Sequence, residues 1–146
     1  MGTYRTEHSS SPQETEAFGE RLAGCLKPGS VIALSGTLGA GKTCLVKGLA
    51  RGLGITENIT SPTYTIINEY RSKHYHLYHI DAYRLNGDED FADTGAGECI
   101  GGNGITIIEW SDRIPRSIPS DAIRIEIEIS GPQSRILRIY NEPACH

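Results

Sequence analysis

The residues best suited to chemistry in this chain form one glycine-rich octapeptide. Residues 36–43 read Gly-Thr-Leu-Gly-Ala-Gly-Lys-Thr, which fits the phosphate-binding pattern G-x-x-x-x-G-K-[ST]. Glycines let backbone N–H groups approach phosphate oxygens, Lys42 offers a charge for the β- and γ-phosphates, and the Thr43 hydroxyl suits Mg²⁺. The predicted ligand contacts are Gly36, Thr37, Leu38, Gly39, Ala40, Gly41, Lys42, Thr43 and Cys44.

The flanking segments place this loop between a strand and a helix. The apolar run 31–35 is typical of a buried strand, and the apolar residues within 44–53 recur at helical spacing. The loop would therefore lie at a helix N-terminus, whose partial positive charge attracts anions. Because a phosphate-binding loop requires this context, we interpret the motif as a nucleotide site rather than as a chance glycine-rich turn.

Two carboxylates are candidates to complete the site. Glu109 ends the apolar run 105–108, and Asp81 ends a predicted strand over 75–81. Ligands of open α/β sheets bind outside the carboxyl ends of the strands, so either carboxylate would be placed to hold Mg²⁺ or to orient an attacking water. We predict Lys42, Asp81 and Glu109 as catalytic residues and Thr43, Asp81 and Glu109 as metal residues; which carboxylate holds the metal stays open.

Three nearby histidines suggest a metal site, but their spacing argues against one. His74 and His76 would share one face of a strand, whereas His79 would point to the other. We therefore interpret them as exposed or partly packed residues of a strand. The chain also lacks the Asn-Lys-x-Asp motif of guanine-specific sites, so adenine is the better prediction for the base.

The N-terminal region predicts one helix with a defined start. Residues 11–14 read Ser-Pro-Gln-Glu, which has the form of a capping box with proline at the first helical position. A helix should begin there and end before Lys27-Pro28-Gly29. The polar residues 1–10 are expected to be disordered.

The remaining patterns predict hairpins on both sides of a polar segment. Alternating residues favour paired strands over 64–70 and 75–81, and again over 122–129 and 135–140. Segment 85–104 is polar and glycine-rich, which indicates a loop with one short acidic helix. We predict a single α/β domain over residues 1–146, with a three-layer P-loop NTPase-like fold and a mixed sheet that is parallel around the loop and antiparallel at the hairpins.

Composition restricts the class of partner. The chain has 146 residues and a formal net charge of −4, without a Lys/Arg run, so direct binding to DNA is not expected. The scattered cysteines indicate reduced thiols, and the chain shows no leader and no membrane-length apolar run. We expect a cytoplasmic protein without a membrane partner, which contacts RNA only through another protein.

Four motifs in this order resemble the bacterial TsaE (YjeE) family. They are the loop 36–43, Ser61-Pro62-Thr63, the stretch His79-Ile80-Asp81-Ala82-Tyr83-Arg84-Leu85, and the pair Glu109-Trp110. The resemblance implies a P-loop ATPase, with ATP and Mg²⁺ as cofactors, that serves threonylcarbamoyladenosine (t6A) synthesis on tRNA. It also implies that the chain binds the TsaB–TsaD transferase heterodimer, hydrolyses ATP to reset it, and meets tRNA only indirectly.

The resemblance adds further site residues. Thr63 would sense the γ-phosphate or Mg²⁺, Trp110 would shape the site or the partner surface, and Ser11 and Thr15 match an N-terminal element near the nucleotide. Ser11 is equally explained as a helix cap, and Trp110 as core packing. The chain departs from the family where Thr37 replaces a common acidic residue, and where segment 88–104 is unusually rich in glycine, which bears on partner contact.

Two other functions share the loop. A small-molecule kinase would need a lid with arginines over the phosphates, and segment 85–104 contains none. A nucleotide-gated binding module would bind ATP without turnover. We expect slow hydrolysis by the isolated chain, because the sequence offers only Arg84 as a candidate arginine finger in cis.

Overall fold

The computed structural model describes residues 3–37, 40–57, 59, 66–72 and 75–144. Its strands are β1 (Tyr4–Ser9), β2 (Val31–Gly36), β3 (Ile67–Arg71), β4 (His76–Asp81), β5 (Ile105–Glu109), β6 (Ile123–Ile129) and β7 (Arg135–Tyr140). Its α-helices are α1 (Pro12–Ala23), α2 (Lys42–Gly52) and α3 (Asp88–Thr94). Short 3₁₀ turns are η1 (Ala96–Cys99), η2 (Ser111–Arg113) and η3 (Pro115–Ser117).

In the described part of the chain, seven strands form one sheet in the order β1-β7-β6-β2-β5-β4-β3. The central strand β2 pairs in parallel with β5 and β6, and β4 pairs in parallel with β5. The outer pairs β3–β4, β6–β7 and β1–β7 are antiparallel. The predicted mixed sheet, parallel around the loop and antiparallel at the hairpins, is confirmed.

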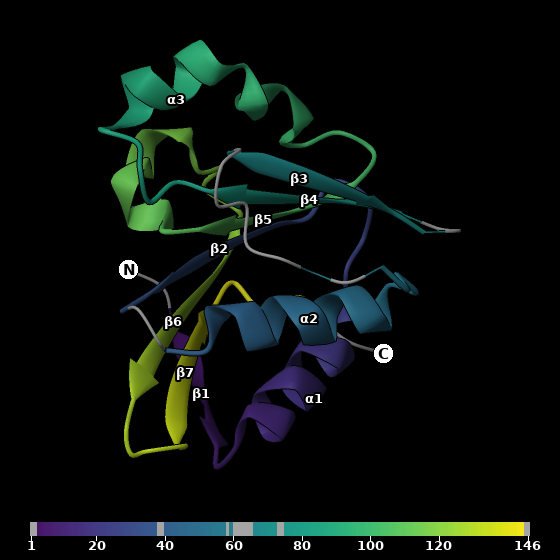
Figure 1. The fold of residues 1–146 in the computed structure, drawn as a ribbon, viewed down its shortest axis with the longest axis vertical. Coiled ribbons are helices and arrows are strands. Elements are labelled where there is room, and N and C mark those ends of the chain that lie inside the picture. The colour runs from purple at the N-terminus through teal and green to yellow at the C-terminus, as the bar shows by residue number, and fades with distance from the viewer. Residues whose placement is uncertain (1–2, 38–39, 58, 60–65, 73–74, 145–146) are drawn as a thin grey trace.

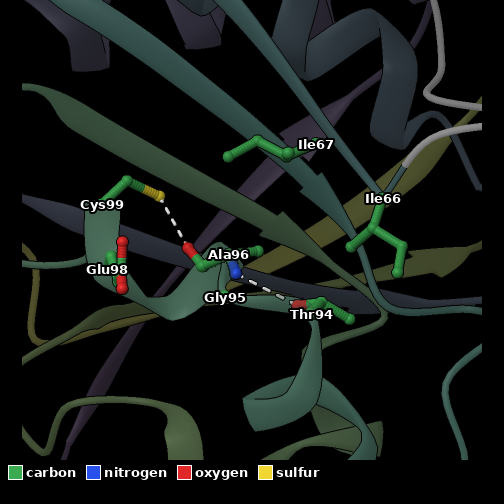
Figure 2. Close-up of a pocket in the computed structure, with 7 residues that line it drawn as sticks. All are labelled: Ile66, Ile67, Thr94, Gly95, Ala96, Glu98 and Cys99. Atoms are coloured by element: carbon green, nitrogen blue, oxygen red, sulfur yellow. Dashed lines mark hydrogen bonds between the residues drawn. The ribbon is translucent and has the colours of Figure 1, made fainter.

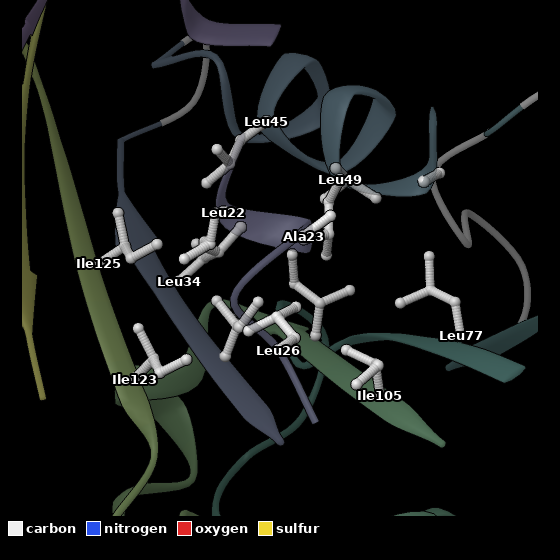
Figure 3. Packing of buried hydrophobic residues seen from close by; sticks show 14 of the residues in the cluster. Leu22, Ala23, Leu26, Leu34, Leu45, Leu49, Leu77, Ile105, Ile123 and Ile125 are labelled. Carbon is white, nitrogen blue, oxygen red and sulfur yellow. The ribbon is translucent and has the colours of Figure 1, made fainter. Parts of the chain in front are cut away.

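Helices cover both faces of the sheet, as Figure 1 shows. Helices α1 and α2 lie together on one face, and α3 with the short turns lies on the other. Figure 3 shows Leu45 and Leu49 of α2 packed over Leu34 of β2 in the larger core. A second core on the opposite face joins Phe91 of α3 to buried residues of β4 and β5, such as Ile108. The fold therefore has the three layers expected.

Most of the predicted elements occur near their expected positions. Ser11 is the N-cap of α1, and its side chain accepts a hydrogen bond from the Glu14 N–H at 3.1 Å. The acidic helix expected in the glycine-rich segment is α3. Strand β3 begins at Ile67, and residues 64 and 65 of the strand that we expected lie outside the described residues.

One expectation for the N-terminal region was wrong. Residues expected to be disordered include β1, an edge strand whose exposed side chains give little local signal because it is formed by backbone pairing with β7. Further along the described chain, Cys44 and Cys99 are free thiols. Among the described helices, none combines the length and apolar character needed to cross a membrane.

Candidate nucleotide site

The glycine loop lies at the carboxyl end of the central strand. Strand β2 ends at Gly36, and α2 begins at Lys42 with Gly41 as its N-cap in a left-handed conformation, φ 100°. Glycine takes this conformation at little cost, and it has no side chain to cap the first amides of the helix. Those amides can then serve an anion, which is the geometry of a phosphate site. Leu38 and Gly39 lie outside the described residues.

Lys42 is buried and held by two groups of the site. Its Nζ donates a hydrogen bond to the carbonyl of Gly36 at 2.7 Å and lies 3.5 Å from the ring centroid of Trp110. Burial lowers the pKa of Lys42, while the nearby carboxylates of Glu109 and Asp81 act in the opposite direction. The ring of Trp110 thus provides a face for the ammonium group through a cation–π contact.

The two acidic residues stand side by side at the ends of neighbouring strands. Asp81 of β4 is directly opposite Glu109 of β5, and Glu109 is in turn opposite Leu34 of β2. Glu109 is buried, with 4% of its surface exposed, whereas Asp81 is half-buried. Burial raises the pKa of Asp81, and a hydrogen bond at 2.9 Å from the N–H of Tyr83 opposes this. Strand pairing therefore brings Asp81 and Glu109 together at the carboxyl ends of β4 and β5, close to Lys42 at the start of α2.

His79 belongs to this group, although its position in the sequence predicted an exposed or partly packed strand face. Its side chain is fully buried, and its Nε2 is hydrogen-bonded to Oε2 of Glu109. His76, in contrast, is partly exposed and contacts Glu69 at 2.9 Å, while His74 lies outside the described residues. Strand alternation predicted the face of His79 but gave no sign of its partner, which comes from a strand distant in sequence.

The four other predicted residues differ in their places in the fold. The Thr15 hydroxyl is buried and lies 2.7 Å from that of Ser9, so it joins the end of β1 to α1. Ser11 caps α1, and Thr63 lies outside the described residues. Arg84, the candidate arginine finger, is an exposed side chain.

The donor set at the loop is compatible with a magnesium–nucleotide complex. Thr43, Asp81 and Glu109 offer a hydroxyl and carboxylate oxygens, the hard ligands that Mg²⁺ prefers. Among the described residues, no group of three or more His, Cys, Asp or Glu side chains could hold a metal by itself. Mg²⁺ in nucleotide sites commonly takes one or two protein ligands together with waters and phosphate oxygens, so these residues fit the ion only with a nucleotide.

Among the hollows lined by described residues, two lie near the carboxyl ends of the parallel strands. One, of about 410 Å³, adjoins the loop and is lined by Gly36, Thr37 and residues of β6 and β7. The other, of about 460 Å³, lies between the start of β3 and the α3–η1 segment (Figure 2). Its lining includes Ile66, Ile67 and Cys99, and the Cys99 thiol donates to the carbonyl of Ala96 at 3.0 Å. None of the predicted phosphate contacts among the described residues lines this second hollow.

The central strand, glycine loop and helix, with acidic strand ends beside them, place the chain among α/β proteins of the P-loop type. Comparison with known proteins supports this class. A crystal structure of Bacillus subtilis YdiB superposes with a TM-score of 0.82 at 35% identity, over 95% of this chain and 86% of that one.

Sequence comparisons define the family. The family model described as "Threonylcarbamoyl adenosine biosynthesis protein TsaE" matches residues 9–137, and the chain belongs to this family. It is 44% identical to a tRNA threonylcarbamoyladenosine biosynthesis protein TsaE of Treponema pallidum over 131 residues, which cover 90% of this chain and 96% of the relative. The Bacillus subtilis protein of the same name is 42% identical over 125 residues, 86% of this chain and 78% of that protein.

Proposed function

We propose that this protein is a cytoplasmic, Mg²⁺-dependent ATPase that assists t6A modification of tRNA by binding a TsaB–TsaD-like transferase pair and resetting it between turnovers. The observation that carries the proposal is the alignment of Asp81 with Glu109 at the strand ends beside the glycine loop. Membership of a family named for t6A biosynthesis supports the pathway. The net charge of −4 agrees with indirect contact to tRNA through the partner.

Each side chain has a definite task in this proposal. Bound Mg²⁺ would offset charge on the phosphates, and Thr43 with Asp81 or Glu109 would hold it, directly or through water. Lys42 would exchange the carbonyl of Gly36 for phosphate oxygens, which are stronger acceptors because they are charged. The remaining carboxylate would accept a hydrogen bond from the attacking water and orient it.

Partner stimulation is part of the proposal. An arginine that stabilises the transferred phosphoryl group can raise turnover by about 10³–10⁵-fold. The side chain of Arg84 is exposed, and no contact between Arg84 and the described part of the loop supports its role as an arginine finger. We therefore expect the isolated protein to hydrolyse ATP slowly. The transferase pair would accelerate hydrolysis by completing or ordering the site.

The decisive experiment measures phosphate release from Mg·ATP by the purified protein, alone and with a purified TsaB–TsaD pair. We expect slow release that the pair stimulates. Lys42→Ala and Glu109→Gln should each lower stimulated release by at least about 100-fold, the usual loss when a catalytic group is removed. Arg51→Met, a change at the opposite end of α2 from the loop, should leave the rate unchanged.

Nucleotide binding separates the alternatives. Trp110 is the single tryptophan and contacts Lys42, so its fluorescence should change when Lys42 moves to a phosphate. A fluorescence change on adding Mg·ATP, without any release of phosphate from that ATP, would favour a nucleotide-gated binding module. Loss of ATP without release of phosphate, in the presence of a hydroxyl acceptor, would favour a kinase. Release that Glu109→Gln and Lys42→Ala leave unchanged would refute the ATPase proposal.

A further inference from the structure

The phosphate loop is held from outside by a side chain of the last strand. Arg135 begins β7, directly after the turn that joins it to β6, and its Nε–H donates to the carbonyl of Ala40 at 2.9 Å. The same guanidinium donates through Nη1 to the carbonyls of Gly131 at 3.1 Å and Ser134 at 2.8 Å. One cation therefore joins the loop to the β6–β7 turn.

The bond from Arg135 sets the direction of one peptide group in the loop. Ala40 is fully buried, and a carbonyl in such a place requires a hydrogen-bond donor. The peptide bonds of the described residues are trans, and in a trans peptide the C=O and N–H point in opposite directions. A carbonyl of Ala40 that faces Arg135 thus turns the Gly41 N–H to the opposite side.

The other described carbonyls of the loop are also bound within the protein. The carbonyl of Thr37 accepts from the Ala40 N–H at 3.1 Å, and that of Gly41 accepts from the Leu45 N–H at 3.1 Å. The carbonyl of Gly36 accepts from Lys42. A loop that binds an anion must direct its acceptors away from the ligand, because a carbonyl facing a phosphate would repel it. Arg135 satisfies this condition for Ala40 from a distant part of the chain.

The charge of Arg135 strengthens the same site. A guanidinium stays protonated at any ordinary pH, and a charge-assisted hydrogen bond to a carbonyl polarises the whole peptide group. The N–H of that group, which belongs to Gly41, becomes a better donor. The guanidinium lies close to this N-cap: a Cβ built on Gly41 would be 4.0 Å from Arg135 Nε. Its charge therefore adds to the positive end of α2.

We propose that Arg135 is a positioning residue of the phosphate site, which orients the Ala40–Gly41 peptide and couples the loop to the β6–β7 turn. The inference rests on the proposed function, because the anion that benefits is the phosphate chain of a nucleotide. In the sequence, Arg135 has no distinguishing mark, because it is the first residue of an ordinary alternating strand. Its partner lies 95 positions earlier in the chain.

The test compares Arg135→Met and Arg135→Lys with Arg51→Met. The Arg51→Met substitution also removes an ion pair, the one that Arg51 forms with Glu16 at 3.1 Å, but Arg51 lies at the end of α2 that is far from the loop. Hydrogen exchange of a peptide spanning 36–45, measured without nucleotide, reports the order of the loop. Calorimetric titration with ADP reports phosphate binding. A peptide within α1 serves as the internal control for overall stability.

We expect about tenfold faster exchange in the loop and about tenfold weaker ADP binding for Arg135→Met, as for the loss of one charge-assisted hydrogen bond. Exchange in α1 should not change. Arg135→Lys should resemble Arg135→Met, because one ammonium group cannot replace a planar fork that spans three carbonyls. If Arg135→Met fails to fold, Arg135→Lys can be compared with the wild type in the same two measurements. Arg51→Met should match the wild type in both measurements.

Two results would overturn the inference. Unchanged loop exchange in both Arg135 variants would show that the contact does not order the loop, whatever the protein binds. Faster exchange with unchanged ADP affinity would show that the orientation of this peptide does not govern phosphate binding. A wild-type protein that binds no ADP would contradict the proposed function instead, and the exchange measurement would still decide whether Arg135 holds the loop.

Discussion

His79 and Glu109 form a buried, hydrogen-bonded pair at the candidate site. Glu109 is only 4% exposed and His79 is fully buried, so each needs the other as a hydrogen-bond partner. The pair also limits the orientations of the Glu109 carboxylate, which lies beside Asp81 across the β4–β5 register. At the scale of the residue, this histidine links the stability of the core to the geometry of the site.

Replacing His79 should therefore cost stability. His79→Leu leaves a buried carboxyl group without its partner, and we expect the free energy of unfolding to fall by about 1–3 kcal/mol. His79→Gln keeps an N–H donor and should lose less. Urea denaturation followed by circular dichroism measures the free energy of unfolding of both variants. His76→Leu, at a partly exposed position, is the control, and its free energy of unfolding should stay within about 0.5 kcal/mol of the wild type. Equal midpoints for His79→Leu and His76→Leu would contradict a stabilising role for the pair.

At the scale of the element, the helix that carries the loop is held by close contact with α1. A Cβ built on Gly48 of α2 would lie 1.9 Å from the backbone oxygen of Glu16, and one on Gly19 of α1 would lie 2.5 Å from that of Leu45. Glycine is needed at both positions because the two backbones leave no room for a side chain. The N-terminus of α2 is therefore supported by a packed pair of helices rather than by α2 alone.

Gly48→Ala tests this packing. The added methyl group must push the helices apart, so we expect a loss of about 2 kcal/mol or more in the free energy of unfolding, although alanine favours an isolated helix. Gly24→Ala, at the end of α1 with φ −67° and its nearest neighbouring atom at 3.4 Å, is the matched control and should be nearly neutral. Thermal denaturation of the two variants gives the comparison. A Gly48→Ala protein as stable as Gly24→Ala would argue against close helix contact.

At the scale of the whole molecule, the first and last strands of the chain pair at one edge of the sheet. Strand β1 pairs with β7, and Arg5 binds the Glu142 carboxylate through Nε at 2.7 Å and Nη2 at 2.8 Å. The hydrogen bond from Arg5 holds the pKa of Glu142 below its usual value near 4.5. The ion pair is partly exposed, so solvent screening keeps its contribution small.

The sign of the pH dependence follows from that lowered pKa. A carboxyl group with a lower pKa in the folded state stabilises the fold above its unfolded pKa, and this contribution disappears as the pH falls through the folded value. The free energy of unfolding of the wild type should exceed that of Glu142→Gln by about 0.5 kcal/mol at pH 7, and the two should converge once the pH falls below the lowered pKa of Glu142. Urea titrations across this range measure the difference. A gap that stays constant with pH would rule out ionisation of Glu142 as its cause.

Local patterns explain why much of the fold was predictable. The capping box at Ser11, the apolar spacing of α2, and the alternation in β4, β6 and β7 each report a periodicity that neighbouring residues impose on one another. The glycine loop was predictable for the same reason, because its motif, strand and helix are contiguous. The expected positions of Asp81 and Glu109 followed from a general rule about strand ends, and the β4–β5 register places the two residues opposite each other.

The sequence alone determined most of the elements, the loop between β2 and α2, and the candidate residues at the strand ends. Only the tertiary structure decided that residues 4–9 form a strand, that His79 is buried against Glu109, that Lys42 lies on Trp110, and that Arg135 reaches Ala40. These contacts depend on the strand order β1-β7-β6-β2-β5-β4-β3. That order is set by the burial of all the strands and helices together, a non-local balance that no short window of residues contains.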